Sequence, residues 1–375
     1  MNHEKYIQRA LQLAKNGIGT TRPNPSVGAV VVYKNTIIGE GFTSPYGNNH
    51  AEVNAINAVK NQELLKKATI YVTLEPCAHF GKTPPCANLI VTKQIPNVII
   101  GCVDTNSLVA GKGIEILKKA GCNVVVGVLE NECKKHHKRF FTVQNKKRPY
   151  VILKWAQTKD GFIAPIRHYE QREVIYKSIS KLPQQKSLLK NDAKPVWISN
   201  KYSQQLVHKL RSNEHAILVG TNTVIADNPK LNVRSWSGEN PIKIILDRNL
   251  RIPLNAAIFD DNVKTIVITD IKKQETSETC HYEDNEAICC EEIDFSKNIA
   301  EQICNVLQKY KIQSVIIEGG AQTLQTFIDS NLWDEANVFI GESQFKDGVE
   351  APVFKAKIIS EEKIQNDILR TYIND

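Results

Sequence analysis

The hydrophobic and polar positions of the first half follow two periods. Tyr6, Ala10, Leu13 and Ala14 recur at helical spacing and predict a helix that ends near Gly17. Runs rich in β-branched residues predict strands. We expect strands at 27–33, 36–42, 69–74, 98–103 and 122–128, and helices at 50–60, 111–120 and 132–141. Helices that alternate with strands indicate a layered α/β domain.

The second half shows the same kind of alternation without repeating the sequence. Apolar runs predict strands at 150–155, 216–219, 242–246, 265–268 and 314–317, and helices at 199–210, 299–310 and up to Asp329. Ser199 is expected to cap the first of these helices. Segment 165–195 is rich in Lys, Gln and Glu with little periodicity, which predicts a long surface insertion. The polar segment 145–149 predicts a boundary between domains 1–145 and 149–375.

Composition limits the class of protein. A chain of 375 residues with 42% hydrophobic and 23% charged residues is typical of a soluble protein of two domains. We find no apolar run of 18 residues and no secretion signal, so we expect no membrane span and a cytoplasmic protein whose nine cysteines are reduced thiols. The net charge of +8 favours anionic ligands such as phosphates, and its even spread does not indicate nucleic-acid binding.

The strongest chemical signal joins His50 and Glu52 to Cys77 and Cys86. One imidazole and two thiols can bind zinc and leave the fourth tetrahedral position to water. Zinc lowers the pKa of bound water from about 15.7 to about 7. Glu52 is placed to take the proton of that water and to pass it to a leaving amine. This arrangement is the signature of zinc nucleobase deaminases.

A structural zinc site is the alternative, but structural sites usually have four protein ligands. His79 is the only further residue at ligand spacing, and we interpret it as too close to Cys77 to complete the same tetrahedron. Cys77 is expected at the start of a helix, where the thiolate is favoured. These considerations favour a catalytic metal.

Two further motifs are weaker signals. In Arg22-Pro23-Asn24-Pro25 the prolines stiffen a loop that can present the Asn24 amide, although the spacing alone favours a plain turn. Glu318-Gly319-Gly320 follows a predicted strand and precedes a predicted helix, as in a phosphate-binding turn. Two glycines at such a turn are more often a matter of backbone geometry.

With these motifs the chain resembles the bifunctional deaminase–reductase family of riboflavin biosynthesis along nearly its whole length. The resemblance is carried by segments 23–28, 50–53 and 73–86, by Leu153-Lys154 with Asp160-Gly161, and by 215–218, 227–229 and 318–320. Eight residues separate Cys77 from Cys86, as in this family, whereas transfer-RNA and cytidine deaminases usually have two.

The resemblance implies a cytidine-deaminase-like α/β/α domain followed by a dihydrofolate-reductase-like α/β domain. The first would replace the 2-amino group of a diaminopyrimidinone that bears ribosylamine 5-phosphate with oxygen, using Zn²⁺. The second would reduce the ribosyl group to ribityl with hydride from NADPH. The implied partners are thus this small phosphorylated pyrimidine and NADPH, without nucleic acid or membrane, and a homo-oligomer is compatible with the sequence.

The resemblance also assigns roles to residues. His50, Cys77 and Cys86 would bind zinc, and Glu52 would transfer protons. The substrate of the deaminase would contact Asn24, His79, Lys82, Asp104 and Asn106. NADPH would contact Ala156, Trp197, Thr223, Asp227, Gly320, Ala321, Gln322, Thr323, Leu324, Gln325 and Thr326. The substrate of the reductase would contact Arg211, Leu231, Arg234 and Glu318, with the arginines suited to a phosphate and surface ion pairs as the alternative.

Three positions depart from the family pattern. The family often has His where this chain has Thr43, and it often has substrate- and cofactor-binding serines where this chain has Pro195 and Arg248. An arginine at position 248 suits the 2′-phosphate of NADPH. Two other functions therefore stand beside the two-enzyme interpretation: a zinc deaminase with a nucleic-acid-binding C-terminal half, and one with a non-catalytic C-terminal half.

Overall fold

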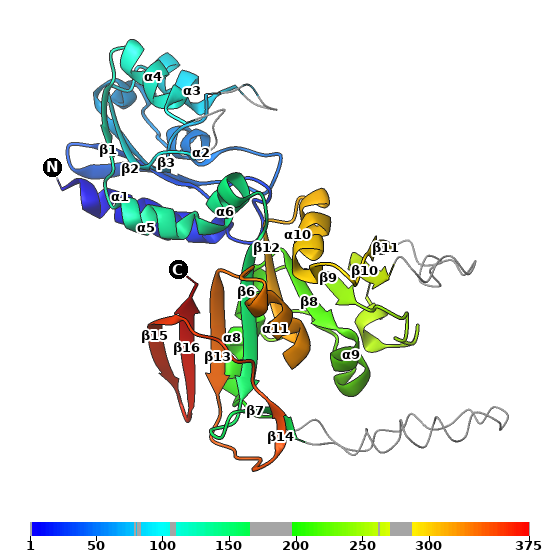
Figure 1. Cartoon of the computed structure of the whole chain (residues 1–375). Helices are drawn as coiled ribbons and strands as arrows, with labels where there is room; N and C mark the ends of the chain where they lie inside the picture. The colour runs from blue at the N-terminus through cyan, green and yellow to red at the C-terminus, as the bar shows by residue number, and fades with distance from the viewer. Residues whose placement is uncertain are drawn as a thin grey trace, which may run out of the picture. The chain divides into compact units, whose positions relative to one another are not determined.

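The computed structural model describes residues 2–78, 80, 84–105, 110–165, 197–261, 263–270 and 287–374 (Figure 1). The chain forms two compact units. The first comprises Met1–Tyr150 with Asn213–His215 and Cys304–Ser314. The second comprises Val151–Ser212, Ala216–Ile303 and Val315–Asp375. Each unit is built around its own β-sheet.

The sheet of the first unit has five strands in the order β2-β1-β3-β4-β5. They are β1 (Gly28–Tyr33), β2 (Thr36–Phe42), β3 (Thr69–Leu74), β4 (Asn97–Cys102) and β5 (Asn123–Val126), close to the predicted bounds. β1 pairs antiparallel with β2 and β3, whereas β3, β4 and β5 are parallel. Lys34 and Asn35 form the β1–β2 turn with φ of 46° and 64°, as a tight hairpin turn requires.

Helices cover both faces of this sheet (Figure 1). They are α1 (His3–Ala14), η1 (Lys15–Gly17), α2 (Ala51–Asn57), η2 (Gln62–Lys67), α3 (Cys86–Thr92), α4 (Lys112–Lys119), α5 (Glu130–His136) and α6 (Lys138–Lys146). The single helix predicted at 132–141 is in fact two helices, which meet at His137. The predicted helix start at Cys77 is also wrong: Pro85 is the extended N-cap of α3, so the helix begins at Cys86.

Two glycines set how closely α1 and α2 approach the sheet. A Cβ on Gly28 of β1 would lie 1.8 Å from the carbonyl oxygen of Ala10 in α1. A Cβ on Gly41 of β2 would lie 2.6 Å from the carbonyl oxygen of Ala51 in α2. Because successive strand residues point to opposite faces and Gly41 pairs with residue 29, α1 and α2 pack on opposite faces. This close packing fixes the position of His50, which directly precedes α2.

The sheet of the second unit has nine described strands in the order β11-β10-β9-β8-β12-β6-β13-β16-β15. They are β6 (Tyr150–Gln157), β8 (Ala216–Gly220), β9 (Ile242–Leu246), β10 (Thr265–Asp270), β11 (Ile288–Ile293), β12 (Ser314–Gly319), β13 (Glu335–Ile340), β15 (Lys357–Ile364) and β16 (Asp367–Ile373). β16 is antiparallel to β13 and β15, whereas the pairs β6–β13, β8–β9, β8–β12, β9–β10 and β10–β11 are parallel. β7 (Phe162–Pro165) and β14 (Gly348–Glu350) form a separate two-stranded sheet.

The described helices of this part of the chain are α8 (Lys201–Asn213), α9 (Thr221–Asp227), η3 (Ala257–Phe259), α10 (Ile299–Lys309) and α11 (Ala321–Asp329). The predicted cap at Ser199 is wrong by one residue. Asn200 accepts hydrogen bonds through Oδ1 from the backbone N–H groups of Tyr202 and Ser203 at 2.9 and 3.0 Å, and so caps α8. The predicted insertion lies outside the described residues except for its first residue, Pro165, which ends β7.

The prediction that all nine cysteines are reduced is wrong for Cys290, which is disulfide-bonded. Seven other cysteines are free, among them Cys77 and Cys86. Within the described residues, every helix is too short or too polar to cross a lipid bilayer.

Candidate active sites

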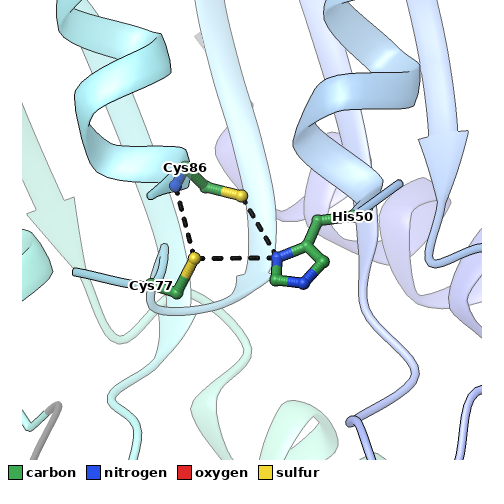
Figure 2. A group of neighbouring side chains, drawn as sticks. All are labelled: His50, Cys77 and Cys86. Carbon is green, nitrogen blue, oxygen red and sulfur yellow. Dashed lines mark hydrogen bonds between the residues drawn. The ribbon is translucent and has the colours of Figure 1, made fainter. Parts of the chain in front are cut away.

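Three side chains that the sequence predicts as metal ligands converge in the first unit. His50 is the N-cap of α2, Cys77 follows β3, and Cys86 is the first residue of α3. Figure 2 shows the three side chains pointing toward one another, with His50 Nδ1 lying 3.6 Å from Cys77 Sγ and 3.3 Å from Cys86 Sγ. All three ligand atoms lie within 4.8 Å of one another.

This arrangement fits a tetrahedral zinc ion. Zinc bonds of about 2.0–2.1 Å to nitrogen and about 2.3 Å to sulfur place tetrahedral ligand atoms roughly 3.5 Å apart. The two nitrogen–sulfur distances, 3.6 and 3.3 Å, bracket that value. The backbone N–H of Cys86 also donates a hydrogen bond to Cys77 Sγ at 3.3 Å, which supports a thiolate there. The described residues offer three ligands here.

The environment of the two thiols favours a thiolate at Cys77 and a protonated thiol at Cys86. The hydrogen bond from Cys86 lowers the pKa of Cys77 to about 4, and His50 contributes to the same effect. The same contact raises the pKa of Cys86 well above its usual value. The hydrogen bond to Cys77 raises the pKa of His50. A dication would displace the remaining thiol proton, because zinc ligation requires thiolates.

Glu52 lies in the first turn of α2 and is only 4% exposed. Besides the contact with Cys77 and burial, the charge of Glu52 also raises the pKa of Cys86, so the carboxyl group lies near that thiol. Burial, assisted by the charge of Cys77, raises the pKa of Glu52 to about 7. A cation bound by the three ligands would oppose this shift. Glu52 is thus a buried acid beside the predicted ligands and shielded from bulk water.

The other residues predicted to contact the deaminase substrate are only partly described. Asn24 is half-buried in a loop in which its N–H donates to the Thr21 carbonyl at 3.0 Å. Asp104 is 8% exposed just after β4. His79, Lys82 and Asn106 lie outside the described residues. The roles of Asn24 and Asp104 as substrate contacts stay predictions.

Thr43, one of the departures from the family pattern, is buried and bonded to the backbone. Its Oγ1 accepts a hydrogen bond from the N–H of Val27 at 2.9 Å. The side chain therefore helps to hold the segment that follows the Asn24 loop.

Sequence reasoning missed the role of Glu75. This residue is 4% exposed, and its carboxylate accepts hydrogen bonds from four backbone N–H groups. The signal that could have revealed it is an acid placed between an apolar strand and Pro76-Cys77, where a charged group requires partners.

In the second unit, residues predicted to contact NADPH gather at the carboxyl ends of adjacent strands. The neighbouring parallel strands β8 and β12 end in Gly220 and Gly319, and each leads into a helix. A Cβ on Gly220 would lie 2.6 Å from Thr323 Oγ1, and one on Gly319 would lie 2.9 Å from Thr223 Cγ2. Thr223 and Thr323 therefore lie beside the carboxyl ends of these two adjacent strands, the edge at which open α/β sheets bind ligands.

The other predicted cofactor contacts lie on the elements next to these strand ends. Ala156 lies on β6, the neighbour of β12, and Asp227 ends α9. Gly320 has a φ of 69° and precedes α11, which contains the remaining predicted contacts, Ala321, Gln322, Leu324, Gln325 and Thr326. Trp197 is 61% exposed.

Two of the predicted substrate contacts of the reductase, Arg211 and Glu318, are bonded to each other. Arg211 donates from Nε and Nη2 to the Glu318 carboxylate at 2.8 and 2.7 Å, and Lys154 Nζ lies 3.6 Å from it. Although burial opposes it, the charges of Arg211 and Lys154 lower the pKa of Glu318 to about 2. Arg211 Nη1 also donates to the Asn232 carbonyl at 3.2 Å, in the loop between Leu231 and Arg234.

This geometry changes the interpretation of the two arginines. Arg211 is not half of a surface ion pair, because its side chain is 11% exposed and that of Glu318 is 5% exposed. Arg234 is exposed and donates to Asn232 Oδ1 at 3.0 Å. Leu231 is buried with a φ of 53°. Of the two guanidinium groups, that of Arg234 is the more accessible.

Of the two departures in the second half, Arg248 and Pro195, only Arg248 lies within the described residues. Arg248 follows β9, and its Nε donates to Asp270 Oδ2 at 2.9 Å while its side chain stays 58% exposed. Pro195 lies outside the described residues.

An α/β/α domain with a His–Cys–Cys cluster and a buried glutamate defines a zinc-dependent deaminase, here joined to a second α/β domain. The model of the cytidine and deoxycytidylate deaminase zinc-binding region matches residues 1–102, and that of the RibD C-terminal domain matches residues 149–342. The chain belongs to the RibD family of riboflavin biosynthesis proteins, because it matches the RibD C-terminal model over half its length and RibD proteins over nearly all of it.

The chain is 38% identical to the RibD protein of Aquifex aeolicus over 92% of this chain and 88% of the relative. It is 34% identical to that of Actinobacillus pleuropneumoniae over 98% and 94%. The crystal structure of the Thermotoga maritima deaminase/reductase superposes with a TM-score of 0.83 at 34% identity, covering 100% of this chain and 99% of that one.

These likenesses confirm the predicted fold class, a cytidine-deaminase-like domain followed by a dihydrofolate-reductase-like domain. The protein is a bifunctional enzyme, a deaminase and a reductase, and its cofactors are Zn²⁺ and NADPH. The match of the second half to a reductase domain supports this interpretation over a nucleic-acid-binding or non-catalytic C-terminal half.

Proposed function

We propose that the enzyme hydrolytically deaminates 2,5-diamino-6-(5-phosphoribosylamino)pyrimidin-4-one and then reduces the ribosyl group of the product to ribityl with NADPH. The final product would be 5-amino-6-(5-phosphoribitylamino)uracil. The Thermotoga structure carries the names of both activities. We assign deamination to residues 1–145 and reduction to residues 149–375.

The observation that carries the proposal is the position of Glu52 relative to the ligand cluster. His50, Cys77 and Cys86 provide one nitrogen and two sulfurs at tetrahedral spacing, and the buried Glu52 lies in the first turn of α2, two residues after His50. A structural site needs no such buried acid, and it usually has four protein ligands. The cluster is therefore suited to hydrolysis.

Zinc bound by these three residues would supply a Lewis acid and a water activated near neutral pH. Glu52 would accept a proton from the attacking water and deliver protons to the ring nitrogen and then to the departing amine. Water adds to the ring carbon, the carbon–nitrogen bond breaks, and ammonia leaves. The burial of Glu52 suits this role, because it shields the proton-transfer group from bulk water.

For the reductase, we propose that the glycine-bordered ends of β8 and β12 receive NADPH. The backbone N–H groups at the starts of α9 and α11 would bind its phosphates. Glu318, Arg211 and Lys154 would orient the ribosyl group, and the more accessible Arg234 would bind the 5-phosphate. This assignment rests on the proximity of Thr223 and Thr323 and on the contacts of Glu318.

The test is Glu52→Gln, which keeps the size of the side chain but removes its ability to take a proton. We expect one zinc per chain, loss of deamination by about 10²- to 10⁴-fold, and unchanged reductase turnover on the deaminated intermediate. Glu63→Gln is the matched control, because Glu63 is an exposed partner of Lys66. Deamination that survives in Glu52→Gln would contradict the proposal.

We further propose that the enzyme acts in the cytoplasm on free small molecules and needs no nucleic acid or membrane. The even spread of its +8 net charge supports this. A gel-shift assay with RNA at 150 mM salt should show no complex.

A further inference from the structure

Glu75 connects the strand that leads to Cys77 with a distant segment. Its Oε2 accepts hydrogen bonds from the N–H groups of Asp104 at 3.3 Å and Gly111 at 3.0 Å. Its Oε1 accepts from Gly113 at 3.0 Å and Ile114 at 3.3 Å. A single carboxylate thus binds four backbone donors that lie 29 to 39 positions further along the chain.

These donors share two features. Asp104 and Gly111 are the two ends of the connection between β4 and α4, so Glu75 holds both ends of that connection. Gly113 and Ile114 lie in the first turn of α4, where backbone N–H groups have no partner within the helix. A negative charge at this end also interacts favourably with the helix dipole. An acceptor-only group satisfies all four donors, whereas a Gln amide would turn its NH₂ toward two of them.

Pro76, the residue after Glu75, also packs closely against the start of α4. A Cβ on Gly113 would lie 2.0 Å from the carbonyl oxygen of Pro76, so the start of α4 approaches the backbone between Glu75 and Cys77 closely. Glu75, which binds the backbone of Asp104 and Gly111, and Cys77, a predicted zinc ligand, are therefore only two residues apart in one segment.

We propose that Glu75 is a positioning residue for the deaminase substrate. It fixes the backbone of Asp104, a predicted substrate contact, relative to the strand end that presents Cys77. This inference rests on the proposed function, in which Asp104 contacts the ribose phosphate part of the substrate. Glu75 itself touches neither the metal nor the reacting atoms, and its effect is on how the substrate is held.

The experiment compares the Glu75→Gln and wild-type enzymes in a deaminase assay and in a reductase assay. The zinc content of each enzyme is measured as well. We expect the KM for the diaminopyrimidinone to rise about tenfold or more, since hydrogen bonds to a charged group are lost. The kcat should change by less than about threefold, because the metal ligands and Glu52 remain. Zinc content and reductase turnover should be unchanged. Glu115→Gln, an exposed change on the same helix, is the control and should alter neither constant.

Amide hydrogen exchange gives a second measurement that does not depend on activity. The N–H groups of Asp104 and Gly111 should exchange faster in Glu75→Gln than in wild type. Faster exchange with an unchanged KM would show that Glu75 is merely structural and would overturn the proposal. An unchanged exchange rate would also overturn it.

A second variant guards against failure of Glu75→Gln to fold. Gly113→Ala keeps the carboxylate but pushes α4 away from Pro76, and it should raise the same KM with zinc retained. An unchanged KM in a folded Gly113→Ala enzyme would overturn the proposal as well. If wild-type enzyme does not deaminate this substrate at all, the proposed function fails instead, so the two failures are distinguishable.

Discussion

Arg211 donates two parallel hydrogen bonds, of 2.8 and 2.7 Å, to the carboxylate of Glu318. The two residues are 107 positions apart in the chain. Lys154 adds a second cation 3.6 Å from the same carboxylate. Burial lowers the pKa of Lys154, and Glu318 counteracts that shift. The three side chains are thus mutually dependent, because each buried charge is tolerated only in the presence of the others.

Glu318→Gln should destabilise the second unit by about 3–5 kcal/mol, because it leaves Arg211 and Lys154 as buried cations without a counter-charge. All four tryptophans, Trp155, Trp197, Trp236 and Trp333, come after residue 150. Tryptophan fluorescence during urea unfolding therefore reports on the second unit alone.

Glu361→Gln is the matched control, because Glu361 also pairs with an arginine, Arg370, at 2.7 Å, but with side chains 52% and 36% exposed. It should change the free energy of unfolding by less than about 1 kcal/mol. If Glu318→Gln and Glu361→Gln lowered the free energy of unfolding equally, this account of the buried cluster would be contradicted.

The stabilisation by Glu318 should also depend on pH. Its folded pKa of about 2 lies below the ordinary value of 4.5, so its contribution is complete above about pH 4.5 and is lost as pH falls toward 2. The difference in unfolding free energy between wild type and Glu318→Gln should therefore narrow across that window. A difference that stays constant from pH 5 to pH 3 would show that this carboxylate does not titrate as stated.

Removal of zinc should separate the two activities. A chelator should abolish deamination while leaving NADPH oxidation and the tryptophan unfolding curve unchanged, and added Zn²⁺ should restore deamination. Cys86→Ser should lose the metal, as measured by elemental analysis. Cys122→Ser is the control, because this free cysteine only donates to the Ile95 carbonyl at 3.4 Å, and it should keep one zinc per chain.

Gly28→Ala should destabilise the first unit by about 1–3 kcal/mol, because the added methyl group would overlap the Ala10 carbonyl and force α1 from the sheet. Circular dichroism during thermal unfolding measures the effect. Gly121→Ala is the comparison, because nothing lies within 4 Å of its Cβ position and only backbone strain at a φ of 85° remains. A larger loss in Gly121→Ala than in Gly28→Ala would refute the packing argument.

The sequence predicted the metal cluster well because its signal is local chemistry. His50, Cys77 and Cys86 are rare metal-binding residue types at recognisable spacing, and the structure brings their ligand atoms together. The helix start at Cys77 was predicted wrongly, because the Pro84-Pro85 pair delays the helix to Cys86.

What the sequence did not reveal depends on distant or backbone partners. The donors to Glu75 are main-chain N–H groups, which every residue except proline carries, so no residue type marks them. The hairpin of β15 and β16 was not predicted either. Its residues are mostly exposed or half-buried and often charged, so a hydrophobic alternation is weak there.

β15 ends the large sheet and has β16 as its only neighbour among the described strands. A strand in that position can recruit another chain through its unused backbone groups. Four charged side chains, Lys357, Glu361, Glu362 and Lys363, lie along it beside the exposed Ile358 and Ile359. Such charges discourage amyloid-like stacking, and their replacement by apolar residues should make this enzyme prone to aggregation without altering either reaction.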